Sequence, residues 1–276
     1  MKEVPFWKMS GSGNDFILMD HREVPWQEWD LPEVARRLCR RRLSLGADGL
    51  IILMPPKDPQ NEFSWRFFNA DGSEAEMCGN GARCAARFAS MKGLAGDRMR
   101  FETLSGVVEA EVEEGWVRIR MGDPLVIHAD MTVPLQEEAH GLVFLDTGVP
   151  HAVSFVGDVE EVDVMQVGRA LRYHQAFAPK GTNADFVQVL DGGGLKMRTY
   201  ERGVEGETLA CGTGAVASAI AAHLRGHVVS PVTVITRSGL SLKVSFREVQ
   251  GHYSEVFLEG EARLVYRGAA TGEAWE

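Results

Sequence analysis

Two cysteines occupy the same position in a repeated, glycine-rich segment, where a pair of thiols could carry acid–base chemistry. The two segments read Cys78-Gly79-Asn80-Gly81-Ala82 and Cys211-Gly212-Thr213-Gly214-Ala215. Residues 78–106 and 211–239 align without a gap at an offset of 133 (211 − 78) and share ten identities, whereas ordinary composition would give roughly two. An offset this long indicates a duplicated domain rather than a stack of short repeats.

Each cysteine precedes an alanine-rich segment, so each thiol is expected at the N-terminus of a helix. There the unpaired backbone N–H groups and the positive end of the helix dipole lower the pKa of a thiol from about 8.5. The glycines leave those N–H groups open to a substrate carboxylate. Two such thiols facing each other across a domain cleft could remove a proton from one face of a carbon and deliver a proton to the other face. The pair therefore predicts inversion of a stereocentre, with the carbanion stabilised by the donors of the two helix starts.

Three other interpretations of this pair stay open. Each cysteine could be a small buried residue at a helix start, which is the common place of a cysteine outside a disulfide. The two could form a disulfide across the cleft and act as a thiol redox switch, or the helix starts could simply bind an anion. Cys84, whose equivalent is Ala217, and Cys39 are expected to be structural.

The composition restricts the class of protein. A chain of 276 residues, 45% hydrophobic and 25% charged, is long enough for two globular domains. The net charge of −10 argues against a nucleic-acid partner. The one basic run, Arg36-Arg37 and Arg40-Arg41-Arg42, is predicted to be the solvated face of a helix.

The first ten residues lack the apolar core of a signal peptide, and no apolar run approaches the about 20 residues that span a bilayer. We therefore expect a soluble, cytoplasmic protein without a membrane partner. Four cysteines are too few for a disulfide framework in a chain of this length. No Cys-x-x-Cys or His-x-x-x-His spacing indicates a metal site, so no metal is expected.

Short alternating or apolar runs, bounded by glycine, proline and aspartate, predict strands through most of the chain. Strands are expected at residues 6–9, 16–19, 50–54, 63–68, 107–112, 116–121, 142–145, 152–156, 186–190, 195–200, 232–236, 240–246 and 253–258. Helices are expected at residues 32–43, 79–92, 163–174 and 212–225. The second and fourth helices are apolar all round and end at Gly93 and Gly226. Each half is therefore expected to be a mostly antiparallel sheet curled around one central helix, with a domain boundary near Gly122 to Pro124.

Long motifs occur in order along nearly the whole chain. They are Gly11-Ser12-Gly13-Asn14-Asp15-Phe16, Asn69-Ala70-Asp71-Gly72-Ser73, Met77-Cys78-Gly79-Asn80-Gly81-Ala82-Arg83-Cys84, Gly148-Val149-Pro150-His151, Gly181-Thr182-Asn183-Ala184-Asp185-Phe186, Tyr200-Glu201-Arg202-Gly203 and Ala210-Cys211-Gly212-Thr213-Gly214. Taken together, these motifs resemble the diaminopimelate epimerase family.

The resemblance implies an isomerase that interconverts LL- and meso-2,6-diaminopimelate without pyridoxal phosphate or metal, in lysine and peptidoglycan precursor synthesis. It also implies an α/β fold of the α+β type with two pseudo-symmetric domains and the active site in the cleft between them. The resemblance further implies that the last strand of the chain, around residues 262–266, belongs to the first domain. The domains would be residues 1–122 with about 262–276, and residues 123–261. A homodimer is the assembly to consider, and no cofactor is expected.

Carried over residue by residue, the resemblance makes Cys78 and Cys211 the acid and base, which exchange roles with the handedness of the substrate. His151 and Glu201 resemble the pair that tunes the thiols. The substrate-binding positions would be Asn14, Asn69, Gly79, Asn80, Asn183, Glu201, Arg202, Gly212 and Thr213. From the residues alone, Asn14 and Asn69 could equally be turn residues, and Glu201 with Arg202 an exposed ion pair.

Two positions depart from some members of the family. Val149 stands where some members have an asparagine that contacts the substrate, and Gly49 where some have glutamine, so the grip on the distal end of the substrate is not defined by the motifs. Within the same fold, a proline or hydroxyproline racemase is the main alternative, although Arg202 and the asparagines suit a more polar substrate. An isomerase of the phenazine-pathway type lacks the thiol pair.

Overall fold

The computed structural model of the protein describes residues 3–135 and 138–275. They form two compact units. Unit 1 comprises Met1–Ile119 with Gly260–Glu276, and unit 2 comprises Arg120–Glu259.

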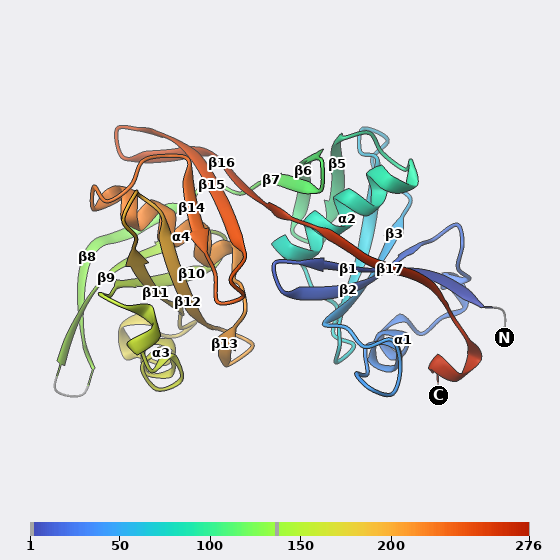
Figure 1. Cartoon of the computed structure of the whole chain (residues 1–276), viewed down its shortest axis with the longest axis horizontal. Helices are drawn as coiled ribbons and strands as arrows, with labels where there is room; N and C mark the ends of the chain where they lie inside the picture. The colour runs from blue at the N-terminus through green and yellow to red at the C-terminus, as the bar shows by residue number, and fades with distance from the viewer. Residues whose placement is uncertain (1–2, 136–137, 276) are drawn as a thin grey trace. The chain divides into compact units, whose positions relative to one another are not determined.

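Unit 1 is built on one mixed sheet (Figure 1). Its strands are β1 (Val4–Gly11), β2 (Asn14–Asp20), β3 (Gly49–Met54), β4 (Phe63–Asn69), β5 (Arg98–Thr103), β6 (Gly106–Glu113), β7 (Trp116–Arg120) and β17 (Arg263–Ala270). The order across the sheet is β17, β1, β2, β3, β4, β5, β6, β7. The pairs β2–β3 and β4–β5 are parallel, and the others are antiparallel. Strand β17 therefore joins the last part of the chain to its first strand.

The two helices of unit 1 pack against opposite faces of this sheet. Helix α1 (Leu31–Leu38) packs into an apolar cluster with Ile17 and Met19 of β2. Helix α2 (Gly79–Lys92) packs near Phe16 of the same strand. Since successive side chains of a strand point to opposite faces, the two helices lie on opposite sides of the sheet. Short 3-10 turns, η1 (Trp26–Glu28) and η4 (Gly272–Trp275), lie beside α1.

Unit 2 repeats this arrangement (Figure 1). Its strands are β8 (Leu125–Leu135), β9 (Glu138–Asp146), β10 (Pro150–Phe155), β11 (Asn183–Val189), β12 (Leu195–Glu201), β13 (Gly206–Thr208), β14 (Val232–Ile235), β15 (Ser241–Val249) and β16 (His252–Glu261). Its helices are α3 (Val164–Arg172) and α4 (Gly212–Leu224), with 3-10 turns η2 (Val159–Glu161) and η3 (Gln175–Phe177). The pairs β10–β11 and β12–β14 are parallel, at the places of β2–β3 and β4–β5 in unit 1.

The sequence offset of 133 holds for the elements as well as for the residues. Helix α1 begins at Leu31 and α3 at Val164 (31 + 133 = 164), and α2 begins at Gly79 and α4 at Gly212 (79 + 133 = 212). The predicted fold class, two pseudo-symmetric α/β domains with a sheet around a central helix, is confirmed.

The helices α2 and α4 end in the same way. The N–H groups of Gly93 and Leu94 donate to Ser90 and Ala89, and those of Gly226 and His227 donate to His223 and Ala222. Both glycines have a positive φ, 68° and 73°, which is the left-handed conformation that closes a helix in this motif. The prediction that the duplicated glycines end the helices is confirmed.

The first helix is shorter than predicted. It ends at Leu38 rather than residue 43, and Cys39 is its C-cap rather than a residue within it. Arg40, Arg41 and Arg42 follow the helix in a turn in which Arg42 has a φ of 70°. The interpretation of the whole basic run as a solvated helix face is therefore wrong, because Arg41 leaves the helical path to pair with Asp15 and Asp48.

Strands β5, β8 and β13 were not predicted. The alternation of buried Met99 and Phe101 with exposed Arg98 and Arg100 is the signature of β5. Strand β8 is mostly exposed and pairs with β9 through two irregularities in register, so it carries little apolar pattern. None of the helices in the described residues is long and apolar enough to cross a membrane.

Gly168 allows α3 to pack closely on β12, and we predict that Gly168→Ala destabilises the protein. A Cβ at this position would lie 2.4 Å from Cβ of the buried Tyr200. Alanine gains about 1 kcal/mol of helix propensity over glycine, but overpacking costs about 1–3 kcal/mol. We expect a net loss of about 1 kcal/mol in the free energy of unfolding, measured by urea denaturation. Arg169→Ala, on the exposed face of the same helix, is the control and should change it little; equal effects of the two substitutions would contradict this account.

Candidate active site

Both duplicated cysteines cap a helix. Cys78 is the N-cap of α2 and Cys211 the N-cap of α4, each with extended backbone (φ −147° and −121°). The first helical hydrogen bonds run from Ala82 N–H to the Cys78 carbonyl and from Ala215 N–H to the Cys211 carbonyl. The N–H groups of the residues between, which include Gly79, Asn80, Gly212 and Thr213, therefore have no acceptor within their helix. Each thiol thus lies beside a set of backbone donors, as the sequence predicts.

In unit 2, a chain of hydrogen bonds leads from Cys211 into the core. The Cys211 Sγ lies 3.5 Å from the Thr213 hydroxyl, which lies 3.0 Å from Nε2 of His151. His151 is fully buried, and its Nδ1 lies 2.7 Å from a carboxylate oxygen of Asp185. The Thr199 hydroxyl donates to the other oxygen of Asp185 at 2.7 Å. The carboxylate therefore fixes the ring of His151 and directs its second nitrogen toward Thr213.

Gly214 makes this packing possible. A Cβ at Gly214 would lie 2.6 Å from an Asp185 oxygen, so a side chain there would push the carboxylate away from His151. The sequence suggests that glycine is needed at this position to leave backbone N–H groups accessible. The structure adds a second requirement, because a side chain at Gly214 would displace Asp185.

The surroundings of Cys211 raise the pKa of its thiol. Burial is the largest cause, and the negative charges of Glu201 and Asp185 add to it, while the Thr213 hydroxyl and the Gly214 N–H offset part of the rise. The pKa of Glu201 is itself raised, mainly by burial, with the Thr208 hydroxyl lowering it in part. The sequence-based prediction of a lowered thiol pKa is therefore wrong for Cys211, since loss of solvation outweighs the donors of the helix start.

Asn183 and Arg202 are joined at the ends of two neighbouring strands. The Asn183 side chain donates to the Pro150 carbonyl at 3.0 Å and accepts from the Arg202 backbone N–H at 2.8 Å. The Arg202 guanidinium lies 3.4 Å from the Lys180 carbonyl. Asn183 is buried, so its amide holds the backbone that carries Arg202.

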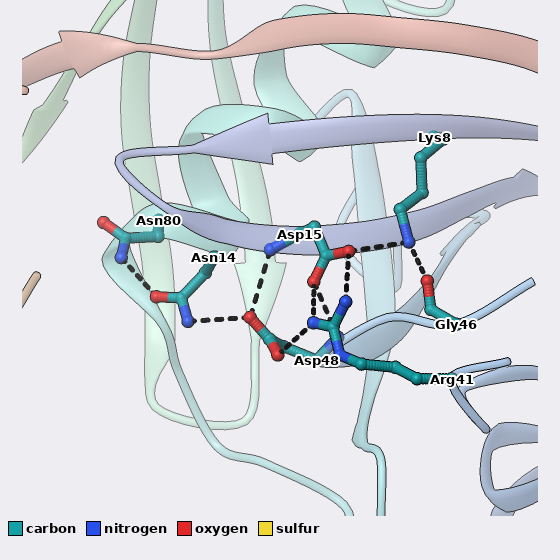
Figure 2. Close-up of polar contacts among 7 residues, drawn as sticks. All are labelled: Lys8, Asn14, Asp15, Arg41, Gly46, Asp48 and Asn80. Atoms are coloured by element: carbon teal, nitrogen blue, oxygen red, sulfur yellow. Dashed lines mark hydrogen bonds and ion pairs between the residues drawn. The ribbon is translucent and has the colours of Figure 1, made fainter. Parts of the chain in front are cut away.

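In unit 1, the asparagines Asn14 and Asn80 form part of a polar network that leads to Arg41, in the turn after α1 (Figure 2). The Asn80 side chain donates to the side-chain amide oxygen of Asn14 at 2.6 Å, and the Asn14 side chain donates to the Asp48 carboxylate at 3.0 Å. Asp48 also accepts from the backbone N–H of Asp15 and from Arg41, at 3.2 and 2.8 Å. Because a carboxylate only accepts, Asp48 fixes which end of the Asn14 amide faces it.

Asp15 anchors the far end of this network. Its carboxylate lies 2.6 Å from Arg41 and 2.8 Å from Lys8, and Lys8 also bonds the Gly46 carbonyl. Although burial raises the pKa of Asp15, its bonds to Lys8 and Arg41 outweigh this effect and lower the pKa below its ordinary value. Figure 2 shows the continuous path from Lys8 through these groups to Asn80.

Asn69 stands apart from this network. It is exposed at the end of β4, and its side chain donates to the Ser73 hydroxyl at 3.0 Å within its own turn. The structure therefore shows the turn interaction that the sequence left open for this residue, and Asn69 as a substrate ligand stays a prediction. Asn14 is different, because its partners lie far away along the chain.

Three further polar groups were not singled out from the sequence. Asp185 lies within a quoted motif, in a strand whose neighbours are all buried, and a charged residue in such a strand is a usable signal. Arg83 lies in a quoted motif too, and Asp48 directly precedes Gly49. Their roles depend on partners far away along the chain, Asn14 for Asp48 and Ser12 for Arg83, which no spacing reveals.

The two positions that depart from the family pattern, Gly49 and Val149, have different surroundings. A Cβ at Gly49 would lie 2.6 Å from the Phe67 ring and 2.8 Å from the Phe68 carbonyl, so this chain has no room for a side chain at position 49. Val149 is partly buried and its backbone carbonyl accepts from the Thr147 N–H.

Comparison with known proteins decides the family. A family model described as diaminopimelate epimerase matches residues 6–127 and 143–265. The chain belongs to this family. A diaminopimelate epimerase of Aquifex aeolicus is 47% identical over 282 residues, covering 99% of this chain and 100% of the relative. One of Methanocella arvoryzae is 43% identical and covers 97% of each chain. As a member of the diaminopimelate epimerase family, the protein is an isomerase of the epimerase type.

Solved structures show the same fold at low identity. A hydroxyproline epimerase of Agrobacterium vitis, with bound trans-4-hydroxy-L-proline, has a TM-score of 0.72 at 15% identity and covers 98% of this chain and 93% of its own. A phenazine biosynthesis protein of Bacillus anthracis has a TM-score of 0.70 at 12% identity and covers 98% and 100%. These likenesses show the fold alone, while the epimerase family match separates this chain from the proline and phenazine groups.

The charges around Cys211 lead to a prediction about its titration. Glu201→Gln removes a negative charge that disfavours the thiolate, so the pKa of Cys211 should fall. The measurement is the pH dependence of iodoacetamide labelling, with the label assigned to Cys211 by mass spectrometry. Glu205→Gln, in the same turn but paired with Arg172, is the control and should leave the midpoint in place. An unchanged or raised midpoint in Glu201→Gln would refute the electrostatic explanation.

Proposed function

We propose that this protein interconverts LL- and meso-2,6-diaminopimelate by moving the α-proton between Cys78 and Cys211. The main observation behind the proposal is a repeated arrangement. In each of the two units, a cysteine is the N-cap of a buried helix and lies beside backbone N–H donors, at equivalent positions. Its membership of the diaminopimelate epimerase family supports the choice of substrate.

The reaction needs one base and one acid at a time. In one direction the Cys78 thiolate takes the α-proton, and the electron pair of the broken C–H bond passes to the α-carbon and its carboxylate. The Cys211 thiol then gives its proton to the opposite face of that carbon, so the configuration inverts and Cys211 is left as the thiolate. In the reverse direction the two sulfurs exchange roles. Both proton transfers are supplied by the thiols, so the proposal includes no cofactor and no metal.

The helix starts stabilise the intermediate. As negative charge spreads onto the substrate carboxylate, backbone N–H groups of Gly79, Asn80, Gly212 and Thr213 are the donors in place to receive it. Donors fixed by a helix need no reorganisation when the charge develops. Gly79 and Gly212 present no side chain that would shield these groups.

The surroundings of Cys211 suit a proton donor. Its raised pKa keeps the sulfur protonated near neutral pH, ready to deliver a proton when Cys78 acts as base. When Cys211 becomes the thiolate, the Thr213 hydroxyl beside it can donate to the sulfur, and His151 supports Thr213. Glu201 and His151 are thus the pair that tunes this thiol.

The remaining predicted residues form the substrate grip in this proposal. Diaminopimelate carries a second amino-carboxylate group, which requires both a cation and amide groups. Arg202, with its backbone held by Asn183, supplies the cation, and Asn14, Asn69 and Asn80 supply amides. Val149 offers no side-chain hydrogen bond, so the distal end depends on the others.

The domains of this proposal are residues 1–122 with about 262–276 and residues 123–261, and their boundaries differ from those of the two compact units by a few residues. The cytoplasm is the proposed location because its reducing conditions keep both sulfurs as thiols. The proposed partner is the small amino-acid substrate, with no nucleic acid or membrane, and a homodimer is the assembly to test.

The proposal predicts exchange of the substrate α-hydrogen with solvent. The reduced protein, without added cofactor, should incorporate deuterium from D2O into LL- or meso-diaminopimelate, as followed by NMR. Cys78→Ala and Cys211→Ala should each lower epimerisation by at least about 1,000-fold, because each removes an acid–base group. Cys84→Ala, on the same helix as Cys78, should retain most of the activity.

The same assay separates the alternatives. A redox switch would need the oxidised form for its function, whereas the epimerase should lose activity on oxidation and recover it with reductant. Proline and hydroxyproline serve as competing substrates. Near wild-type epimerisation in either alanine variant, or a preference for proline, would overturn the proposal.

A further inference from the structure

Arg83 is a fully buried cation, 0% exposed, on the first turns of α2. One of its nitrogens, Nη2, donates to the Ser12 hydroxyl at 2.7 Å and to the side-chain amide oxygen of Asn80 at 2.8 Å. Its Nε and Nη1 have no hydrogen-bond partner in the described part of the chain. Both partners of Nη2 are neutral, so these contacts do not balance the charge. An uncompensated buried charge is costly, and buried cations are normally paired with an anion.

Two thiols lie near enough to Arg83 to act on its charge. The groups that interact electrostatically with its guanidinium are Cys84 and Cys78, both of which favour its charged form against the effect of burial. Burial raises the pKa of Cys84 to about 12 in spite of the nearby cation, so this thiol stays neutral at physiological pH. Cys78 is the group of the two that can supply a negative charge.

The other groups that face α2 leave this assignment intact. The strands β1, β2, β3 and β6 pack against the helix. They present apolar side chains to it, namely Trp7, Met9, Phe16, Leu18, Ile51, Val108 and Ala110. Lys8 and Asp15 point to the opposite face of the sheet, toward Gly46 and Arg41. On the helix itself, Arg87 is the other charged group near Cys84, and it bonds the Ala262 carbonyl.

The equivalent position in the second unit carries no charge. Position 216 (83 + 133) is Val216, fully buried in α4. There the groups around the cysteine are the carboxylates of Glu201 and Asp185. The duplicated helix starts therefore share a backbone but have opposite charges beside their sulfurs: a cation near Cys78 and anions near Cys211.

We propose that Arg83 is the positioning residue that holds Cys78 as a thiolate in the resting protein, with the buried guanidinium as its internal counter-charge. The inference rests on the proposed function for its catalytic meaning, since a Cys78 thiolate and a Cys211 thiol form a pair ready for one direction of proton transfer. The same side chain holds Asn80, and through Asn80 it fixes the amide of Asn14. Because guanidinium only donates, Asn80 turns its oxygen to Arg83 and its nitrogen to Asn14, which continues the path in Figure 2.

The test separates the charge of Arg83 from its hydrogen bonds. Arg83→Gln removes the charge but keeps an N–H donor for Ser12 and Asn80, and Arg83→Lys keeps the charge. Labelling of Cys78 by iodoacetamide is measured against pH, with mass spectrometry to assign the site. We expect the midpoint in Arg83→Gln to rise by at least about one unit. Near pH 7 its labelling should slow by up to about tenfold for each unit of that rise. Arg83→Lys should lie near the wild type.

Two controls keep the result interpretable. Cys84→Ala alters the same core without changing its charge and should leave the midpoint of Cys78 in place. Ser12→Ala removes one hydrogen bond of Arg83 but not the cation, and it should have little effect. A midpoint that stays unchanged in Arg83→Gln, or that shifts equally in Ser12→Ala and Arg83→Gln, would overturn the proposal.

The labelling result does not depend on the substrate. If Cys78 titrates as expected but the protein does not epimerise diaminopimelate, the proposed function fails and the role of Arg83 stands. If epimerisation is normal and the pH midpoint of Cys78 labelling is the same in Arg83→Gln as in the wild type, the proposed role of Arg83 is wrong and the proposed function stands. If the protein is active, the acidic limb of the pH–rate profile should shift to higher pH in Arg83→Gln. In Arg83→Lys it should lie near the wild-type position.

Discussion

The burial of α2 and α4 on nearly all sides constrains almost everything else in the two units. A helix enclosed by strands can carry few large side chains, so both are built mainly from alanine, glycine and other small residues. Their backbones are fully hydrogen-bonded along their length, which leaves the N-terminal N–H groups as the reactive part of each helix. The cysteine that caps such a helix lies where the positive end of its dipole acts on a neighbouring group.

Duplication gives two copies of this backbone arrangement, and the side chains around them then differ. Near Cys78 the neighbouring charge is the guanidinium of Arg83, whereas near Cys211 it is the carboxylates of Glu201 and Asp185. Burial and these carboxylates raise the pKa of Cys211 in spite of the helix start. A dipole at a helix end contributes about 0.3–1 kcal/mol at exposed positions, while full burial shifts a pKa by several units. The helix start therefore sets where the sulfur lies, and its surroundings set its protonation.

Much of this structure follows from the sequence, and the parts that do not share a physical cause. The repeated Cys-Gly-x-Gly segments and the glycines at positions 93 and 226 specify both central helices, because caps are local. The length of the first helix does not follow from local pattern, since Arg41 leaves it for distant Asp15 and Asp48. The same holds for the buried partners of His151 and Asn14, which are set by strand pairing. Strand β5 is an exception, because its alternation of buried and exposed residues is a local pattern from which the strand could have been predicted.

The position of β17 at the end of the chain determines which unit can complete its sheet first during synthesis. Strand β17 supplies the antiparallel neighbour of β1, and the turn that follows it bonds Arg37 and Ser44 beside α1. The ribosome makes these residues after the whole of unit 2. Until they emerge, β1 exposes an unpaired edge, and such edges promote association between nascent chains. Unit 2 has all of its strands available earlier, so the second half of the gene product completes its sheet before the first half does.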